Sequence, residues 1–529
     1  MKRPIIITLI LLVVTIAVTI VYFKNLHRNG PRTREVLQNI PDNAPLILQF
    51  NNDNSFYDIF NESWLFTNVI GKNTMVELDT LRNQLLLNEQ FEPFFTGQNI
   101  FISLHPLKNN TVGLLLTTAA KQKFNATAID ELAKQKNTGL LITPFNIGTK
   151  KAYTIYSRIL KKRFYLVNKE EGIFSGSFSK DLVMQSARHI IKKDKANFIL
   201  LPDKQNSNSL ANLYVNYSQL SPLFEQLFRN KNTDVFKYFK SFPALAALSL
   251  NFKSDALMFN GYSEIQANQP SAYLNLFAQQ QAVTNELKDI FPSTTAYYIS
   301  FAVSDPQKFK SDLSEYFTRA GFQPEKDSLF NRIKTETGIN LITQFNQLLG
   351  NEFAVATTRY QEKLAIISLK DGSQLKPTMY NIATMSTDNV GQINYNKLPY
   401  FLLGEAFAPF NHPWFMIIDN YLILANSQTE LNSYYDTYVN RKFQSKLEQY
   451  KQFDNLVAEQ SNVSWYINFN QSQSILKRDL NENIYNLYSN NTPGWKNFYA
   501  ASYQLVATNK KFYTNFCIRL NPPDSISTK

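Results

Sequence analysis

The feature that most constrains this fold is an internal similarity, because five short apolar runs recur in the same order about 250 residues apart. The first runs follow Pro41 and Pro292, which are 251 residues apart, and the later pairs keep offsets between 250 and 255. The paired runs are residues 46–50 and 297–303, 97–102 and 350–355, 165–174 and 415–423, 213–217 and 465–469, and 246–262 and 501–517. A series that recurs at one period is typical of a structural unit written twice. The sequence therefore predicts two homologous units in tandem.

Within each unit the runs are typical of strands joined in pairs by short polar turns. Residues 463–469 alternate apolar with more polar side chains, which predicts a strand with one solvent-facing side. Asp419-Asn420 and Asp371-Gly372 are interpreted as turns between or after strands. Ser427 and Glu430 have the spacing of a capping box, so we expect a helix to start there. Together these patterns predict antiparallel sheet with packed helices, an α+β fold.

The N-terminal segment Pro4–Phe23 contains no charged residue. As a helix its length would be about 30 Å, the thickness of a bilayer core, and we predict a retained transmembrane anchor. A cleaved signal peptide is the alternative, but Val21–Lys24 lacks the small-x-small site that cleavage needs. The short basic tail before the segment favours a cytoplasmic N-terminus, with the bulk of the chain in the periplasm or on the extracellular side. The basic residues that follow the segment weaken the support for this predicted orientation.

These patterns divide the chain into five parts. Residues 1–34 are the transmembrane anchor with its juxtamembrane segment, and 35–268 are the first α+β unit. Residues 269–286 are a linker, 287–524 are the second α+β unit, and 525–529 are a frayed tail. The expected location is therefore the inner (cytoplasmic) membrane, with a single span.

Several kinds of chemistry find little support in the sequence. The single cysteine, Cys517, excludes an intramolecular disulfide and a cysteine-based zinc site. Phosphate-loop, dinucleotide, nucleophile-elbow and H-E-x-x-H motifs are absent. The four histidines, His27, His105, His189 and His412, lie more than ten residues apart, and each is interpreted as structural. We therefore predict no catalytic, cofactor-binding or metal-binding residues, and no cofactor.

Charged residues are also interpreted as mainly structural. Asp53 and Asp305 follow corresponding strands, and helix N-capping explains both, although a paired-carboxylate hydrolase stays open. The net charge is +12, with basic runs at 161–163 and 192–195. A solvated face, or contact with anionic lipid, is the expected role of these runs. An extracytoplasmic location makes nucleic acid an unsuitable partner.

The layout resembles an uncharacterised family of bacterial membrane-anchored envelope proteins, a domain of unknown function. The residues that carry the resemblance are the anchor Pro4–Phe23, the opening Ile40–Leu46, and Asp419–Asn426 before a helix. The resemblance implies an envelope location and no particular activity.

Three functional hypotheses follow. The first is a membrane-tethered, extracytoplasmic binding or scaffolding protein of the cell envelope, with the lipid bilayer and an envelope protein as partners. The second is a carrier or sensor of apolar ligands such as lipids. The third is an enzyme of a type that shows no motif. The sequence does not indicate the oligomeric state.

Overall fold

The computed structural model describes residues 32–522, except 108–110, 122–123, 125–126, 135–138, 171, 192–197, 202–208, 231–236, 267–271 and 493. The predicted anchor Pro4–Phe23, His27, the basic run 192–195 and the tail 525–529 lie outside the described residues. Among the helices that are described, none combines the length and the apolar character that crossing a bilayer requires.

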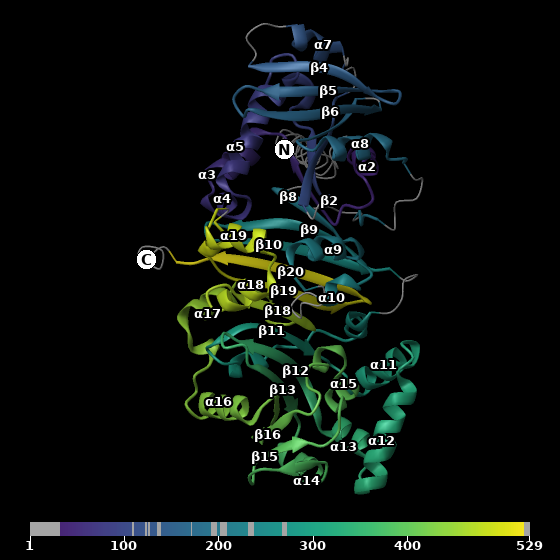
Figure 1. Cartoon of the computed structure of the whole chain (residues 1–529), viewed down its shortest axis with the longest axis vertical. Coiled ribbons are helices and arrows are strands. Elements are labelled where there is room, and N and C mark those ends of the chain that lie inside the picture. Colours follow the sequence, from purple (N-terminus) through teal and green to yellow (C-terminus); the bar gives the residue numbers. More distant parts are fainter. Residues whose placement is uncertain are drawn as a thin grey trace, which may run out of the picture. The chain divides into compact units, whose positions relative to one another are not determined.

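The described chain forms two compact units. The first reaches Asn216 and includes Ala247–Asn251, and the second comprises Tyr217–Ala246 and the chain from Phe252 onward. Each unit is built on antiparallel strands, coloured from purple to yellow along the chain in Figure 1.

In the first unit, β1 lies between β8 and β2, and the pairing continues through β3, β7, β6, β5 and β4. The strands are β1 (Leu46–Asn51), β2 (Asn99–Leu107), β3 (Thr111–Ala119), β4 (Leu140–Ile147), β5 (Lys150–Ser157), β6 (Lys162–Glu170), β7 (Ile173–Ser177) and β8 (Ala211–Asn216). β9 (Ala244–Lys253) has residues in both units. The strand β4 is an edge of this described pairing and carries Pro144, a residue that suits an edge because it lacks a backbone donor.

In the second unit, β11 lies between β18 and β12. Pairing continues on one side through β13, β17, β16, β15 and β14, and on the other through β19, β20 and β10. The strands are β10 (Ala256–Ile265), β11 (Thr295–Ala302), β12 (Leu349–Thr358), β13 (Lys363–Leu369), β14 (Ala383–Met385), β15 (Val390–Ile393), β16 (Trp414–Ile418), β17 (Tyr421–Ala425), β18 (Val463–Asn468), β19 (Phe498–Thr508) and β20 (Lys511–Leu520).

Helices accompany the strands of both units. In the first they are α2 (Thr33–Gln38), α3 (Asn54–Glu62), α4 (Trp64–Ile70), α5 (Lys72–Leu81), η1 (Arg82–Leu86), α6 (Glu92–Phe95), α7 (Thr127–Lys134) and α8 (Lys180–Arg188). In the second they are η2 (Tyr217–Gln219), α9 (Leu220–Leu227), α10 (Lys237–Lys240), η3 (Tyr273–Phe277), η4 (Leu287–Ile290), α11 (Pro306–Arg319), α12 (Gln323–Thr337), α13 (Leu341–Leu348), α14 (Gly372–Asn381), α15 (Leu398–Leu403), η5 (Glu405–Phe407), α16 (Gln428–Val439), η6 (Gln444–Lys446), α17 (Glu448–Asp454), α18 (Gln473–Asp479), α19 (Glu482–Ser489) and η7 (Trp495–Asn497).

The predicted fold class, an α+β chain of two tandem homologous units that each have antiparallel sheet and packed helices, is wrong. The described strands belong to one twenty-stranded antiparallel sheet with helices, not to two separate sheets. The strand β10 shows the error most directly. The prediction ended the first unit at residue 268, yet residues 256–263 pair in register with β20 near the C-terminus. An unpaired strand edge presents free N–H and C=O groups, and pairing with another strand satisfies them.

Helices cover both faces of the central strands in the second unit. Figure 1 shows α16 and α17 on one side of β11–β13, and α11, α12 and α15 on the other. On one face the sheet packs Tyr298 and Tyr466 against Tyr434 and Phe453 of α16 and α17. On the other face Phe301 packs against rings of η3 and β12, and Phe309 of α11 packs against the same rings. The expected solvent-facing side of residues 463–469 is therefore wrong, since Ser464, Tyr466 and Asn468 are all buried.

Two predictions from local sequence patterns, a helix cap and a turn between strands, are confirmed. Ser427 is the N-cap of α16, and its side chain accepts a hydrogen bond from the Glu430 amide. The Glu430 side chain in turn accepts a hydrogen bond from the Asn426 amide. These two bonds confirm the predicted capping box. Asp419-Asn420 is the turn between β16 and β17. The interpretation of Asp371-Gly372 as a simple turn is wrong, because Asp371 caps the helix α14.

Candidate functional site

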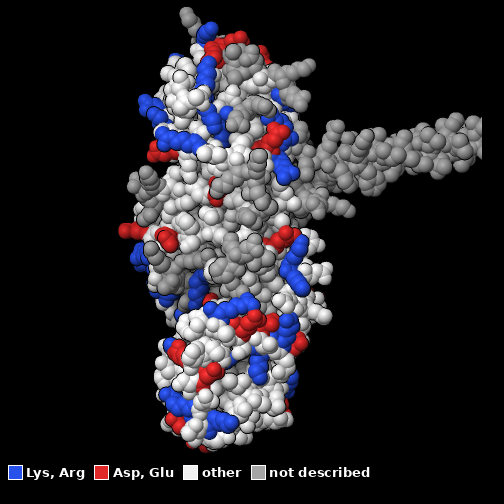
Figure 2. Space-filling view, turned by 90° about the vertical axis from the view of Figure 1, so that its right-hand side faces the viewer, with Lys and Arg blue, Asp and Glu red and all other residues white. Residues whose placement is uncertain are grey.

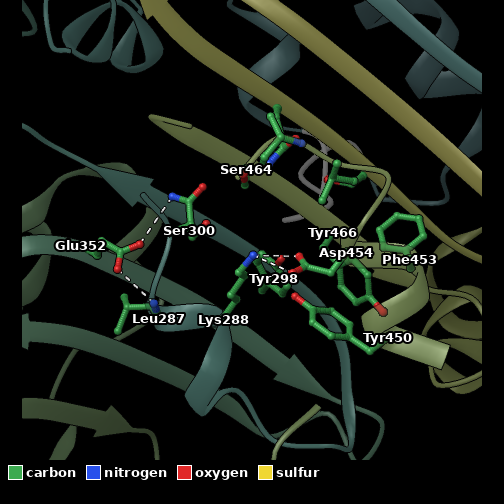
Figure 3. A pocket seen from close by; sticks show the side chains of 15 residues that line it. Leu287, Lys288, Tyr298, Ser300, Glu352, Tyr450, Phe453, Asp454, Ser464 and Tyr466 are labelled. Carbon is green, nitrogen blue, oxygen red and sulfur yellow. Dashed lines mark hydrogen bonds and ion pairs between the residues drawn. The ribbon is translucent and has the colours of Figure 1, made fainter. Parts of the chain in front are cut away.

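A small buried pocket lies among β11, β12, β18 and β19, beside η4 and α17 (Figure 3). Its interior volume is about 20 Å³, which is room for about one water molecule. The residues that line it are largely polar or aromatic, and those labelled in Figure 3 are Leu287, Lys288, Tyr298, Ser300, Glu352, Tyr450, Phe453, Asp454, Ser464 and Tyr466.

Glu352 of β12 is the buried carboxylate of this pocket, with 6% of its surface exposed. Its oxygens accept hydrogen bonds from the backbone amides of Glu286 and Leu287 at 2.9 and 3.0 Å, where the short helix η4 begins. Burial raises the pKa of Glu352 to about 7, although the backbone donors act in the opposite direction. The carboxylate therefore works as a cap for η4, in a place where its charge is poorly solvated.

Lys288 of η4 and Asp454 of α17 form the second polar pair of the pocket. The Lys288 Nζ lies 2.7 Å from an Asp454 carboxylate oxygen, and both side chains are partly buried. Burial also raises the pKa values of Tyr298, Tyr450 and Tyr466, so these three hydroxyls stay protonated. The charged groups of the pocket are thus already bound to other parts of the chain, and the space left between them suits a water rather than a substrate.

A larger and more open pocket lies between α11, α12, α13 and α15, with a volume of about 360 Å³. Its apolar wall consists of the buried Phe309, Leu313 and Phe401, together with Ile342 and Leu402. Its polar lining consists of Gln307, Lys310, Ser311, Ser314, Lys326 and Asn346. Pockets of about 300–1,000 Å³ with apolar walls and a few polar groups are the usual form of small-molecule sites.

The helices around this pocket form for reasons that the sequence carries locally. Asp305 caps α11 by accepting from the amides of Gln307 and Lys308, and Pro306 occupies the first helical turn. Phe309 and Leu313 are four residues apart, so they share the buried face of α11. The pocket lies along the edge of that face, which explains why lysine and serine side chains flank its apolar wall.

The two amines of the pocket come from neighbouring helices. Lys310 is on α11 and Lys326 is on α12, and both side chains are partly buried. Lys326 donates a hydrogen bond to Ser314 Oγ at 2.9 Å, and its Nζ lies 5.9 Å from the centre of the Phe317 ring. Burial lowers the pKa of Lys326, Asp327 raises it, and the positive charge of Lys310 lowers it further.

Leu402 also lines a second cavity. This smaller cavity has a volume of about 10 Å³ and is lined only by apolar side chains, among them Phe345, Met379 and Leu424.

The face of the molecule shown in Figure 2 mixes both signs of charge. Lysine and arginine side chains lie among aspartates and glutamates, with uncharged surface between them. On this face the net charge of +12 is not gathered into a single large basic field.

The residues considered in the sequence lie apart from both pockets. Asp53 caps α3 by accepting from the Phe56 amide at 3.0 Å, and Asp305 caps α11, so the capping interpretation is confirmed for both. His105 is buried inside β2, between Ser103 and Asn43 at 2.8 Å each, and burial lowers its pKa to about 3.

The remaining candidates are equally separate. His189 directly follows α8, and His412 contacts the carbonyl oxygen of Ile393 at 3.3 Å. Cys517 is buried in β20, and burial raises the pKa of its thiol to about 12. The prediction named no residue of either pocket. The spacing of Phe309, Leu313 and Phe317 signals the buried face of α11, but no local pattern pairs Lys310 with Lys326.

Comparison with known proteins adds no relative: no family model, no curated protein and no solved structure matches this chain.

Proposed function

We propose that this chain is a tethered binding protein of the cell envelope that holds an apolar ligand in the pocket between α11, α12, α13 and α15. The observation that supports the proposal is the shape and lining of that pocket: about 360 Å³, with Phe309, Leu313 and Phe401 forming an apolar wall. Of the two functional hypotheses without catalysis, this observation favours the carrier or sensor of apolar ligands.

The energetics of burial support an apolar ligand. Each methylene group that leaves water for an apolar site stabilises the complex by about 0.8 kcal/mol. The wall side chains are already buried and belong to regular helices, so little ordering is needed when a ligand enters. The small polar pocket in Figure 3 is less suited to a ligand, because its volume of about 20 Å³ admits little more than a water.

Photolabelling of the full chain in its native membranes tests the proposal. The probe is a dodecanol that carries a diazirine, and the labelled peptides are identified by mass spectrometry. We expect labels on α11, α13 and α15, and competition by unlabelled dodecanol. Ser311→Trp places an indole at the pocket from an exposed position on α11 and is expected to reduce this labelling at least fivefold.

Thr343→Trp is the matched control, because Thr343 is exposed on α13 and does not line the pocket. Labelling spread evenly over the chain, or equal labelling of the Ser311→Trp and Thr343→Trp variants, would refute the pocket as the binding site.

The location of the protein is a proposal that rests on the residues of Pro4–Phe23. Protease added to intact spheroplasts is expected to digest the chain from the outside. If the chain resisted the protease until the cells were lysed, the proposed orientation would be contradicted.

A further inference from the structure

We infer that the ligand of the pocket between α11, α12, α13 and α15 is a single-chain amphiphile with an anionic head group, bound with its head between Lys310 and Lys326. This inference rests on the proposed function and specifies the ligand class of the same site. It follows from three observations: the position of the amines, the pairing of the surrounding charges, and the presence of both polar and apolar lining.

The first observation is the position of the two amines. Lys310 and Lys326 line one pocket from two different helices, and the positive charge of Lys310 acts on Lys326. Neither side chain is fully exposed. Two partly desolvated amines disfavour each other, and an anion placed between them would relieve both the repulsion and the lost hydration.

The second observation concerns the carboxylates on the same helices, most of which already have partners. Asp312 pairs with Lys308 at 3.2 Å, and Glu325 pairs with Lys397 at 2.7 Å. Glu315 pairs with Arg319.

Asp327 acts on Lys326 through its charge. Within the described residues, however, neither Lys310 nor Lys326 forms an ion pair. The pocket therefore has positive charge that a ligand can neutralise, which is the charge complementarity an anionic head group needs.

The third observation is that the pocket has both a polar and an apolar lining. Lys326 is held by Ser314 at 2.9 Å, and both line the pocket with Lys310. Leu402 lines the same pocket and also the small apolar cavity behind it. A ligand with its head at the amines can place its chain against the partly exposed apolar lining residues Ile342 and Leu402. A fatty-acid-like molecule has this distribution of charge and hydrocarbon.

The test uses three photoreactive twelve-carbon probes that differ only in the head: a carboxylate, a hydroxyl and a trimethylammonium. Each probe is applied to the full chain in native membranes, and pocket labelling is compared between variants for one probe at a time. Comparing variants within one probe removes differences in how the probes partition into the bilayer. Lys326→Met and Lys310→Met remove one charge each and keep an unbranched side chain. Lys334→Met, exposed on α12 and outside the pocket, is the matched control.

We expect Lys326→Met and Lys310→Met each to reduce labelling by the carboxylate probe at least fivefold and labelling by the hydroxyl probe less than twofold. Lys334→Met should leave both unchanged, and Lys326→Arg should retain most of the carboxylate labelling because it keeps the charge. Equal effects of the lysine variants on the three probes would overturn the inference while the proposed function stands. If no probe labels the pocket of the unmodified chain, the proposed function fails as well.

Discussion

The carboxylate of Glu352 and the backbone amide of Leu287 are joined by a hydrogen bond of 3.0 Å, across 65 positions of the sequence. This contact ties β12 to the start of η4 and places a carboxylate where only 6% of its surface is exposed (Figure 3). Since burial raises the pKa of Glu352 to about 7, the cap changes its charge near neutral pH. The stability of the second unit should therefore depend on pH at this residue.

Glu352→Gln is expected to change that dependence. The folded state keeps the Glu352 proton up to about pH 7, whereas an ordinary glutamate loses it near 4.5. The folded state thus binds more protons between these values, and its stability falls as pH rises through them. Glutamine carries no charge, so the free energy of unfolding of the variant relative to wild type should rise by about 2–3 kcal/mol from pH 5 to pH 8. Urea unfolding followed by tryptophan fluorescence provides the measurement.

Glutamine presents one oxygen where glutamate presents two, so Glu352→Gln also loses an acceptor at every pH. That loss is independent of pH and does not affect the comparison. Glu482→Gln, which removes an exposed carboxylate at the start of α19, is the control and should change the pH slope little. If the free energies of unfolding of wild type and Glu352→Gln changed with pH in parallel, the raised pKa of Glu352 would be contradicted.

Gly404→Ala should be strongly destabilising. Gly404 ends α15 with a φ of 96°, and a Cβ at this position would overlap the ring of Tyr273. The Tyr273 hydroxyl donates to the Leu403 carbonyl at 2.5 Å, so the ring has little freedom to move away. We expect a loss of at least about 3 kcal/mol in the free energy of unfolding, measured by urea unfolding.

Gly338→Ala is the control that measures the cost of a left-handed backbone without the steric overlap expected for Gly404→Ala. Gly338 ends α12 with a φ of 71°, and a Cβ there would meet nothing within 4 Å. Its expected loss is the left-handed backbone cost alone, about 1–2 kcal/mol. Equal losses for the two variants would show that the Tyr273 ring does not confine Gly404.

Cys517 should react with thiol reagents only when the chain opens. It is the single cysteine of the chain, it is 3% exposed in β20, and burial raises its pKa to about 12. The thiolate is the reactive form, so at pH 8 very little of the folded chain carries a reactive Cys517. Iodoacetamide labelling followed by intact-mass measurement should show almost no adduct in buffer and one adduct in urea. Fast labelling in buffer would mean that β20 opens readily.

Predictions from the sequence succeeded where neighbours along the chain decide the structure. Asp53, Asp305 and Ser427 cap helices as their spacing indicates, because a cap needs only a backbone amide two or three residues away. The antiparallel strand runs were also recognisable. The buried polar face of β18 was not, because side chains that cover it, such as Tyr298 of β11 and Tyr434 of α16, come from more distant parts of the sequence.

In the candidate site, too, the local elements can be predicted from the sequence, whereas the contacts between them cannot. The helix that carries Lys310 follows from its own cap and apolar stripe, but the approach of Lys326 and the wall at Phe401 depend on how α11, α12 and α15 pack. Glu352 looks like an ordinary strand residue in the sequence, and only its burial beside η4 shifts its pKa.

The sequence by itself therefore determined the local elements of this protein: which runs form strands, where several helices begin, and that Cys517 has no disulfide partner within the chain. The tertiary structure alone decided which strands pair across long stretches of sequence, such as β10 with β20, and which polar groups lie together in a pocket. The physical reason is range. Caps and side-chain periodicity act over a few residues, whereas strand pairing and desolvation depend on groups that folding brings together from distant parts of the chain.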